Sequence, residues 1–303
     1  MELKKEDIFK QYKWLKRKKA KFIISADYDG LICASFLSHF LNWKLVGYYN
    51  MENIWISSEG IKNRNNIIWV DLNILAHNGK SIGGHITMLN GDSVPDGFIT
   101  SCNPNNILKI NNKQFNRKYP FSTLVFLLWL FDYQVPHNEY AKFLILHSDN
   151  IWMKLQNYKS NVINWTKLFS NFNWNKLFES IDSIDFEKKI DQIYYPKLIK
   201  LNAVSGFSKL KSKHLKIRSR ELKFNPDWDE DIILKLFDLF ASYLKWTPPE
   251  LPEIIKKVNG KKTSVKLSSI NTNFLDFLND NKVFSYAITS PNVLKYTNFN
   301  KIK

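Results

Sequence analysis

The feature that most constrains the fold is an acidic turn between a short apolar strand and a helix near the N-terminus. Residues 21–25 are apolar enough for a buried strand, and residues 31–43 are small and apolar enough for a packed helix. Asp27, Asp29 and Gly30 lie between them, and Gly30 permits a sharp turn. This order predicts an open α/β sheet, in which ligands bind at the carboxyl ends of the strands.

Strand and helix patterns continue to alternate through the first half of the chain. The expected strands are residues 44–49, 66–72, 86–89 and 97–101, and the expected helices are residues 122–131 and 138–152. Such alternation is typical of a parallel sheet with helical crossovers. We therefore predict an α/β fold in which residues 1–155 form a parallel-sheet domain.

The second half of the chain predicts a helical connector and a smaller α/β domain. Residues 156–199 are rich in Trp, Phe, Asn and Lys with helical periodicity, which indicates a helical connector. Residues 200–303 are expected to form a basic C-terminal domain. It would contain an amphipathic helix over residues 227–244 and short strands around a helix near residues 273–278.

The chain carries an excess of positive charge. Its 303 residues include 44 Lys and Arg against 28 Asp and Glu, which gives a formal net charge of +16 at pH 7. Such an excess favours anionic partners, chiefly nucleic acid. Only five of the basic residues are Arg, while Asn and Ile are abundant. The codon bias of an AT-rich genome is therefore a second explanation for the lysines.

Cysteine count and hydropathy exclude several classes of protein. Cys33 and Cys102 are the only cysteines, too few for a disulfide scaffold or a Cys-rich zinc module. The longest apolar run, residues 124–131, is too short to span a bilayer. No signal-peptide core follows the basic N-terminus. We expect a soluble, cytoplasmic protein with no membrane partner.

Four aspartates that follow apolar segments are candidate ligands. Asp27 and Asp29 follow the first strand, Asp71 ends the strand of residues 66–72, and Asp149 follows a further apolar run. Carboxylates at one sheet edge can converge on a cation, and a helix that starts there favours a phosphate. The alternative is structural, because aspartates also cap turns, helices and strand ends.

Together these residues resemble the DHH phosphoesterase superfamily, which includes RecJ-like nucleases and oligonucleotide or cyclic-dinucleotide phosphodiesterases. Asp27-Tyr-Asp29-Gly30-Leu31 is similar to the first motif, Asp71 to the second and Asp149 to the fourth. Residues 81–86 fall where the Asp-His-His triplet is expected. The resemblance covers about residues 20–155 and implies a divergent member with degenerate motifs.

The resemblance implies a metal site that has lost its histidines. Ser25 and Ile23 occupy the positions at which the family has a metal-binding His, and the triplet reads Gly83-Gly84-His85. The metal ligands that the resemblance leaves are Asp27, Asp29, Asp71 and Asp149. Their oxygen atoms suit Mg²⁺, and Mn²⁺ is the other expected cofactor. His85 would contact phosphate as a catalytic residue, and its alternative is a half-buried His beside two glycines. His147 is a substitute ligand or a helix-surface residue.

A basic segment lies in the expected C-terminal domain. The candidate nucleic-acid-binding residues are Lys211, Lys213, Lys216, Arg218 and Arg220. Their alternation includes a set on one strand face, which could track a phosphate backbone. The DHH family carries a C-terminal associated domain that binds the substrate strand, although its Gly-rich GGGH signature is absent here. Solvated surface lysines are the alternative explanation.

The resemblance implies metal-dependent phosphodiester hydrolysis of single-stranded DNA or RNA or of short oligonucleotides, with the metal activating water. The alternative is a catalytically decayed relative that binds nucleic acid or scaffolds a replication or defence complex. A protein–protein module is a third class, which explains the missing histidines but not the retained aspartates. A homodimer and a larger protein complex are both possible assemblies.

Overall fold

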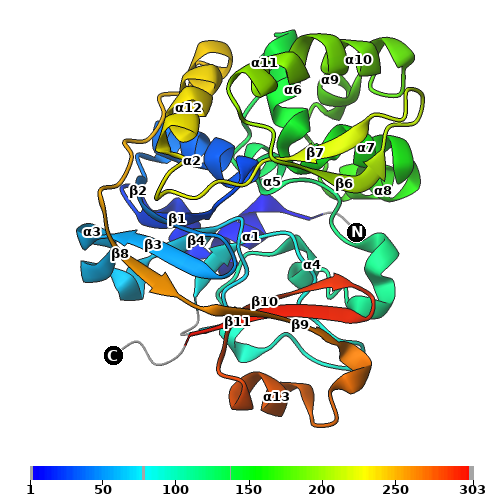
Figure 1. The fold of residues 1–303 in the computed structure, drawn as a ribbon. Coiled ribbons are helices and arrows are strands. Elements are labelled where there is room, and N and C mark those ends of the chain that lie inside the picture. The colour runs from blue at the N-terminus through cyan, green and yellow to red at the C-terminus, as the bar shows by residue number, and fades with distance from the viewer. Residues whose placement is uncertain (1–2, 77–78, 137, 300–303) are drawn as a thin grey trace. The chain divides into compact units, whose positions relative to one another are not determined.

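The computed structural model describes residues 3–76, 79–136 and 138–299, which form a mixed α/β fold (Figure 1). These residues divide into two compact units that are interleaved along the chain. Unit 1 is drawn from residues 1–7, 26–40 and 120–249, and unit 2 from residues 8–25, 41–119 and 250–303. The predicted domain boundaries near residues 155 and 199 stay a prediction.

Unit 2 contains a six-stranded sheet in the order β5-β4-β1-β2-β3-β8 (Figure 1). Its strands are β1 (Lys21–Ser25), β2 (Lys44–Tyr49), β3 (Asn53–Ser57), β4 (Ile68–Val70), β5 (Lys80–Ile82) and β8 (Ile254–Asn259). The first four strands in that order run parallel, whereas β3 and β8 are antiparallel to their neighbours. The predicted α/β class with a mostly parallel sheet is confirmed, and its DHH-like architecture stays a prediction.

Burial of apolar side chains explains why these segments form strands. Four consecutive residues of β1 are buried, a run typical of parallel strands rather than of half-exposed ones. Gly47 of β2 lets β3 approach closely, because a Cβ atom there would lie 2.3 Å from the carbonyl oxygen of Trp55. The buried core around these strands consists of Ile23, Val46, Tyr49, Ile54, Ile56, Ile67, Trp69, Leu72 and Ile74.

Unit 2 also contains a three-stranded antiparallel sheet in the order β10-β11-β9. The elements are β9 (Lys261–Lys266), α13 (Phe274–Asp280), β10 (Val283–Ser290) and β11 (Val293–Asn298). The predicted helix near residues 273–278 with strands around it is therefore confirmed. The short helices α3 (Ser58–Lys62) and α4 (Pro104–Ile107) belong to unit 2, and α1 (Lys5–Gln11) crosses the boundary between the units.

Unit 1 is mostly helical. Its helices are α2 (Tyr28–Leu41), α5 (Thr123–Leu130), α6 (Glu139–His147), α7 (Ile151–Asn157), α8 (Lys159–Leu168), α9 (Trp174–Phe178), α10 (Ile184–Lys189), α11 (Tyr195–Lys200) and α12 (Glu230–Leu244). All residues of α5 are buried, whereas α12 buries one apolar face, as its amphipathic pattern predicts. A hairpin of β6 (Gly206–Lys211) and β7 (Arg218–Glu221) lies beside α7 (Figure 1).

Three local expectations were wrong. Residues 97–101 do not form a strand, because a tight 3₁₀ turn, Asp96–Phe98, forms there. Residues 86–89 make only isolated bridges. The helix expected over residues 138–152 is broken between α6 and α7, where two residues adopt a left-handed backbone. The short strands β3 and β5 were not expected.

Among residues 3–76, 79–136 and 138–299, no helix has both the length and the apolar character that crossing a membrane requires. This finding agrees with the short apolar runs in the sequence.

Candidate functional site

The acidic turn starts helix α2 in unit 1, and both of its aspartates have structural partners. Oδ1 of Asp27 accepts the backbone N–H of Gly30 at 3.0 Å, as an N-cap does. Asp29 is 5% exposed, and its Oδ2 accepts the backbone N–H of Thr123 at 2.9 Å. Its Oδ1 accepts the N–H of Leu124 at 3.4 Å. The carboxyl group of Asp29 therefore binds the N-terminus of α5.

Asp149 lies in the 3₁₀ turn Ser148–Asn150, which separates α6 from α7 in unit 1. Asp149 and Asn150 both have a left-handed backbone, with φ angles of 53° and 51°. This conformation is uncommon for residues other than glycine, and such strain is concentrated at functional sites. The carboxylate of Asp149 pairs with Lys154 at 2.7 Å.

A pair of serines attaches this turn to the helix that binds Asp29. Oγ of Ser148 donates to Oγ of Ser122 at 2.8 Å. Ser122 in turn caps α5, whose first N–H groups contact the Asp29 carboxyl. The fold of unit 1 thereby holds Asp29 and Asp149 at the same helix N-terminus. That these two residues correspond to the first and fourth DHH motifs stays a prediction.

Burial and neighbouring acids raise the pKa of Asp29 to about 8. Loss of hydration is the largest cause, and the charges of Asp149 and Asp27 add to it. The backbone N–H groups of Thr123 and Leu124 oppose the shift. At neutral pH the carboxyl of Asp29 is therefore mostly protonated unless a cation binds nearby. A carboxyl group perturbed by burial and by charge is a marker of functional sites.

These carboxyl groups suit a hard cation by chemistry but not by placement. Carboxylate oxygens are the ligands that Mg²⁺ prefers. In the part of the chain that the structure describes, however, no three His, Cys, Asp or Glu side chains lie close enough together to hold a metal ion. As placed, the side chains do not fit a resident metal. The expected Mg²⁺ or Mn²⁺ site stays a prediction.

Asp71 and His85, the other candidate site residues, belong to unit 2. Asp71 follows β4 with a φ angle of 60°, and its Oδ2 accepts the hydroxyl of Ser25 at 2.7 Å. His85 is exposed, and its backbone carbonyl accepts the side-chain amide of Asn103 at 2.7 Å. That Asp71 and His85 share a site with the aspartates of unit 1 stays a prediction.

Two buried asparagines, not singled out from the sequence as functional, hold the loop that contains the Gly83-Gly84-His85 triplet. Besides its bond to His85, Asn103 donates to Oδ1 of Asn73 at 3.0 Å, and Asn105 donates to the carbonyl of Gly84 at 2.7 Å. A Cβ atom on Gly83 would lie 2.6 Å from a backbone carbonyl oxygen. Tight backbone packing thus accounts for a glycine at position 83.

His147 is buried, so its interpretation as a helix-surface residue was wrong. The residue is 3% exposed, and its ring packs edge to face against Tyr28 and Tyr194 at centroid distances of 4.7 and 5.4 Å. Burial, and to a smaller extent the charge of Arg220, lowers the pKa of His147 to about 3. Its imidazole is therefore neutral at physiological pH.

The five predicted nucleic-acid-binding residues all belong to the β6–β7 hairpin and its loop. Lys211 and Arg218 are cross-strand neighbours, and both are exposed. Lys213 pairs with Asp182 at 2.9 Å, and Lys216 donates to the carbonyl of Lys213 at 2.8 Å. Lys211 and Arg218 are therefore presented to solvent. Lys213 and Lys216 make contacts that help to shape the loop.

Arg220 differs from the other four because its side chain is only 18% exposed. Its guanidinium carbon lies 4.2 Å from the ring centre of Tyr195 and 5.8 Å from that of Phe207. Nη2 lies 3.6 Å from the carboxylate of Asp191. The sequence indicated this arginine but not its burial, which depends on α11 packing against the hairpin.

Glu187 of α10, which the sequence did not single out, organises the hairpin loop. Its Oε1 accepts the backbone N–H of His214 at 3.0 Å, and its Oε2 accepts that of Leu215 at 2.7 Å. Burial acts to raise the pKa of Glu187, but the hydrogen bonds from Leu215, His214, Ser212 and Gln156 together outweigh it, and the pKa is lowered. A fully buried carboxylate thus fixes the basic loop.

Beyond β7, the chain continues from the hairpin to the acidic turn. Residues 222–224 pair in antiparallel fashion with residues 26–28, and both segments belong to unit 1. The N–H of Phe224 donates to the carbonyl of Ala26 at 3.2 Å, and the N–H of Tyr28 donates to that of Leu222 at 3.3 Å. The segment that follows the basic hairpin is therefore hydrogen-bonded directly to the turn that contains Asp27 and Asp29.

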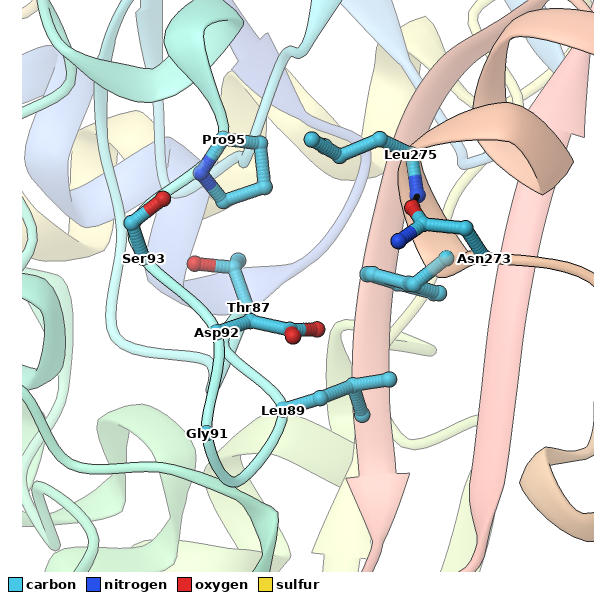
Figure 2. A pocket seen from close by; sticks show the side chains of 9 residues that line it. Thr87, Leu89, Gly91, Asp92, Ser93, Pro95, Asn273 and Leu275 are labelled. Atoms are coloured by element: carbon cyan, nitrogen blue, oxygen red, sulfur yellow. Dashed lines mark hydrogen bonds between the residues drawn. The ribbon is translucent and has the colours of Figure 1, made fainter.

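A cavity of about 250 Å³ lies in unit 2 and contains none of the predicted site residues. Figure 2 shows one wall formed by the loop with Thr87, Asp92 and Pro95, and the other by the start of α13 with Asn273 and Leu275. The lining has one carboxylate and no basic side chain. It is therefore poorly suited to a phosphate or a nucleic acid.

Comparisons with known proteins found no relative for this chain. No family model, no curated protein and no solved structure matches it. The resemblance to the DHH superfamily therefore depends on the motifs around Asp27, Asp29, Asp71 and Asp149 alone.

Proposed function

We propose that the chain binds single-stranded nucleic acid or a short oligonucleotide through its β6–β7 hairpin, on a divergent DHH-like scaffold. The observation that carries this proposal is the antiparallel contact between residues 222–224 and residues 26–28. It makes a basic ribbon and the acidic turn neighbours within one unit. A phosphate backbone bound to the ribbon would thereby lie beside the turn that resembles the first DHH motif.

The hairpin presents the side chains that a single strand requires. Phe207, Lys209 and Lys211 are the exposed residues of β6, and they alternate with less exposed ones. Arg218 is the cross-strand neighbour of Lys211, so the two side chains share a face. Lys and Arg contact phosphates, whereas an exposed aromatic ring such as Phe207, which is 61% exposed, stacks on bases that are unpaired.

Metal-dependent phosphodiester hydrolysis is the second candidate, favoured by the raised pKa of Asp29. The charges of Asp149 and Asp27 contribute to that shift, and a divalent cation would relieve their repulsion. Binding alone is preferred because the described side chains bring no three metal ligands together. The two candidates differ in whether a cation is required and in whether the strand is cleaved.

Fluorescence anisotropy with labelled single-stranded DNA, single-stranded RNA and duplex tests the proposal. The hairpin variant carries Lys209→Gln, Lys211→Gln and Arg218→Gln. The matched control removes three exposed lysines of β9 and β11 by Lys261→Gln, Lys266→Gln and Lys295→Gln. The hairpin variant should bind single strands more weakly. Its log–log salt slope should flatten by about two units, since each phosphate contact contributes about 0.7.

The control variant should leave the salt slope nearly unchanged. Equal effects of the two triple variants would show that diffuse lysine charge is responsible, and would contradict the proposal. The same strands incubated with Mg²⁺, Mn²⁺ or a chelator separate the two candidates. Cation-dependent shortening that Asp29→Ala abolishes would establish hydrolysis, and binding without shortening would support binding alone.

A further inference from the structure

Arg220 carries hydrogen-bond donors that the described residues do not satisfy. Nε and Nη1 of its guanidinium are buried and have no hydrogen-bond partner in residues 3–76, 79–136 and 138–299. A buried donor without a partner costs free energy, and more so on a charged group. Because Arg stays protonated at all physiological pH values, the missing partner is expected to be an acceptor that carries negative charge.

Among the neighbours of Arg220, His147 and Asn150 also have buried polar atoms without hydrogen-bond partners in the described residues. They are Nδ1 of His147 and Oδ1 of Asn150, in residues that are 3% and 6% exposed. The ring of His147 lies 5.6 Å from that of Tyr195, on which the Arg220 guanidinium stacks. Asn150 donates its Nδ2 to the carbonyl of Arg220 at 3.0 Å. We name Arg220, His147 and Asn150 the Arg220 cluster.

We propose that the Arg220 cluster binds a phosphate-class oxyanion. Guanidinium N–H groups match the oxygens of a phosphate in both geometry and charge. The neutral imidazole of His147 can add an Nδ1–H donor, and Oδ1 of Asn150 can accept from a water or hydroxyl that accompanies the anion. The identification of this oxyanion as a phosphodiester of a bound strand rests on the proposed function, whereas the anion site itself does not.

The acids near the cluster are engaged with cations or solvent. Asp149, next to Asn150 in sequence, pairs with Lys154 at 2.7 Å. Asp191 lies 3.6 Å from Nη2 of Arg220, but its side chain is 42% exposed and therefore hydrated. These acids leave Nε and Nη1 of Arg220 without an acceptor, so an incoming oxyanion has donors to bind.

Phe207 gives the cluster an opening toward the hairpin face. It is the cross-strand neighbour of Arg220, and its ring centre lies 5.8 Å from the guanidinium carbon. Because Phe207 is 61% exposed, its ring can move with little loss of buried apolar surface. Such a movement would expose Arg220 on the strand face that carries Lys209 and Lys211.

Calorimetric titration with inorganic phosphate at constant ionic strength tests the anion site. Wild type is compared with Arg220→Gln and with Arg64→Gln, an exposed arginine of unit 2 that lies outside the hairpin. Loss of the charged donors should weaken phosphate binding by about tenfold or more in Arg220→Gln. Arg64→Gln should bind phosphate as the wild type does. Arg220→Lys keeps the positive charge but lacks the planar set of N–H donors of the guanidinium. It tests the anion site if Arg220→Gln does not fold.

A folded Arg220→Lys protein with clearly weakened phosphate binding supports the site, and one that binds like the wild type overturns it. Absence of phosphate binding to the wild type also overturns it. Competition identifies the source of the oxyanion. Displacement of a bound oligonucleotide by phosphate supports a strand phosphodiester, and binding without displacement supports free phosphate or a nucleotide. If no oligonucleotide binds while phosphate binding still depends on Arg220, the proposed function fails and the anion site stands.

Discussion

The backbone N–H of Phe224 donates to the carbonyl oxygen of Ala26 at 3.2 Å, although the two residues come from distant parts of the sequence. This bond lies at the point where the chain leaving the basic hairpin pairs with the acidic turn. The hairpin and Asp29 belong to the same unit, and this pairing connects them.

The raised pKa of Asp29 predicts that stability falls as pH rises. The pKa is about 8 in the folded protein against an ordinary value of 3.8, so between these values the folded state holds a proton that the unfolded state has lost. Stability is therefore lost progressively as pH rises through this window, by at most about 1.4 kcal/mol per pH unit, and the loss levels off above the folded pKa.

Asp29→Asn cannot ionise and should remove most of this pH dependence. Urea unfolding of both proteins at several pH values between about 5 and 8 measures the difference. An identical slope in the wild type and in Asp29→Asn would show that another group is responsible.

Glu187→Ala should destabilise unit 1 and weaken strand binding. The change removes two part-buried hydrogen bonds from the N–H groups of His214 and Leu215 to a charged acceptor, which costs about 1–3 kcal/mol. Glu139→Ala is the control, because the ion pair of Glu139 with Lys189 is exposed and worth less than about 1 kcal/mol. Chemical denaturation of both variants measures the effect. Equal stabilities would refute the role of Glu187.

Tyr194→Phe should lower stability by about 1 kcal/mol. Its hydroxyl lies 2.8 Å from the hydroxyl of Tyr28, and both side chains are buried. Tyr28 keeps its bond to the carbonyl of Leu144, at 3.1 Å, so the loss is limited to one bond. Tyr158→Phe, at a residue that is 55% exposed, should unfold like the wild type. A Tyr194→Phe protein as stable as Tyr158→Phe would contradict the expected contribution.

Added Mg²⁺ or Mn²⁺ should raise the unfolding temperature no more than an equal ionic strength of Na⁺ does. This expectation follows because no three potential ligands lie together among the described residues. Differential scanning fluorimetry of the wild type and Asp29→Ala measures it. A cation-specific stabilisation that Asp29→Ala removes would favour the second candidate, hydrolysis.

Local patterns predicted much of the fold. The bounds of β1 and β2, the buried helix α5 and the amphipathic helix α12 follow from runs and periodicity that are visible within each segment. The break between α6 and α7 was missed because the polar residues 147–150, between two apolar runs, fit an exposed turn of a continuous helix as well as they fit a break. Nothing in their residue types specifies the left-handed backbone of Asp149 and Asn150. The turn at residues 96–98 was mistaken for a strand because its apolar residues pack without strand pairing.

Less of the candidate site could be predicted. The aspartates and the basic segment were identified from residue type and spacing, but the partners that set their properties are remote in sequence. Thr123 and Leu124 bind Asp29, and Tyr195 stacks on Arg220. Burial of Arg220 and burial of Asp29, which raises the pKa of that carboxyl, are consequences of tertiary packing, which no local pattern encodes.

Amide hydrogen exchange with and without a single-stranded oligonucleotide tests binding at the hairpin most directly. Binding there predicts stronger protection in residues 206–221, extending to residues 222–224 and 26–28, with β9 and β11 unchanged. Protection confined to unit 2, or no change in residues 206–221 while the strand is bound, would contradict the proposed function.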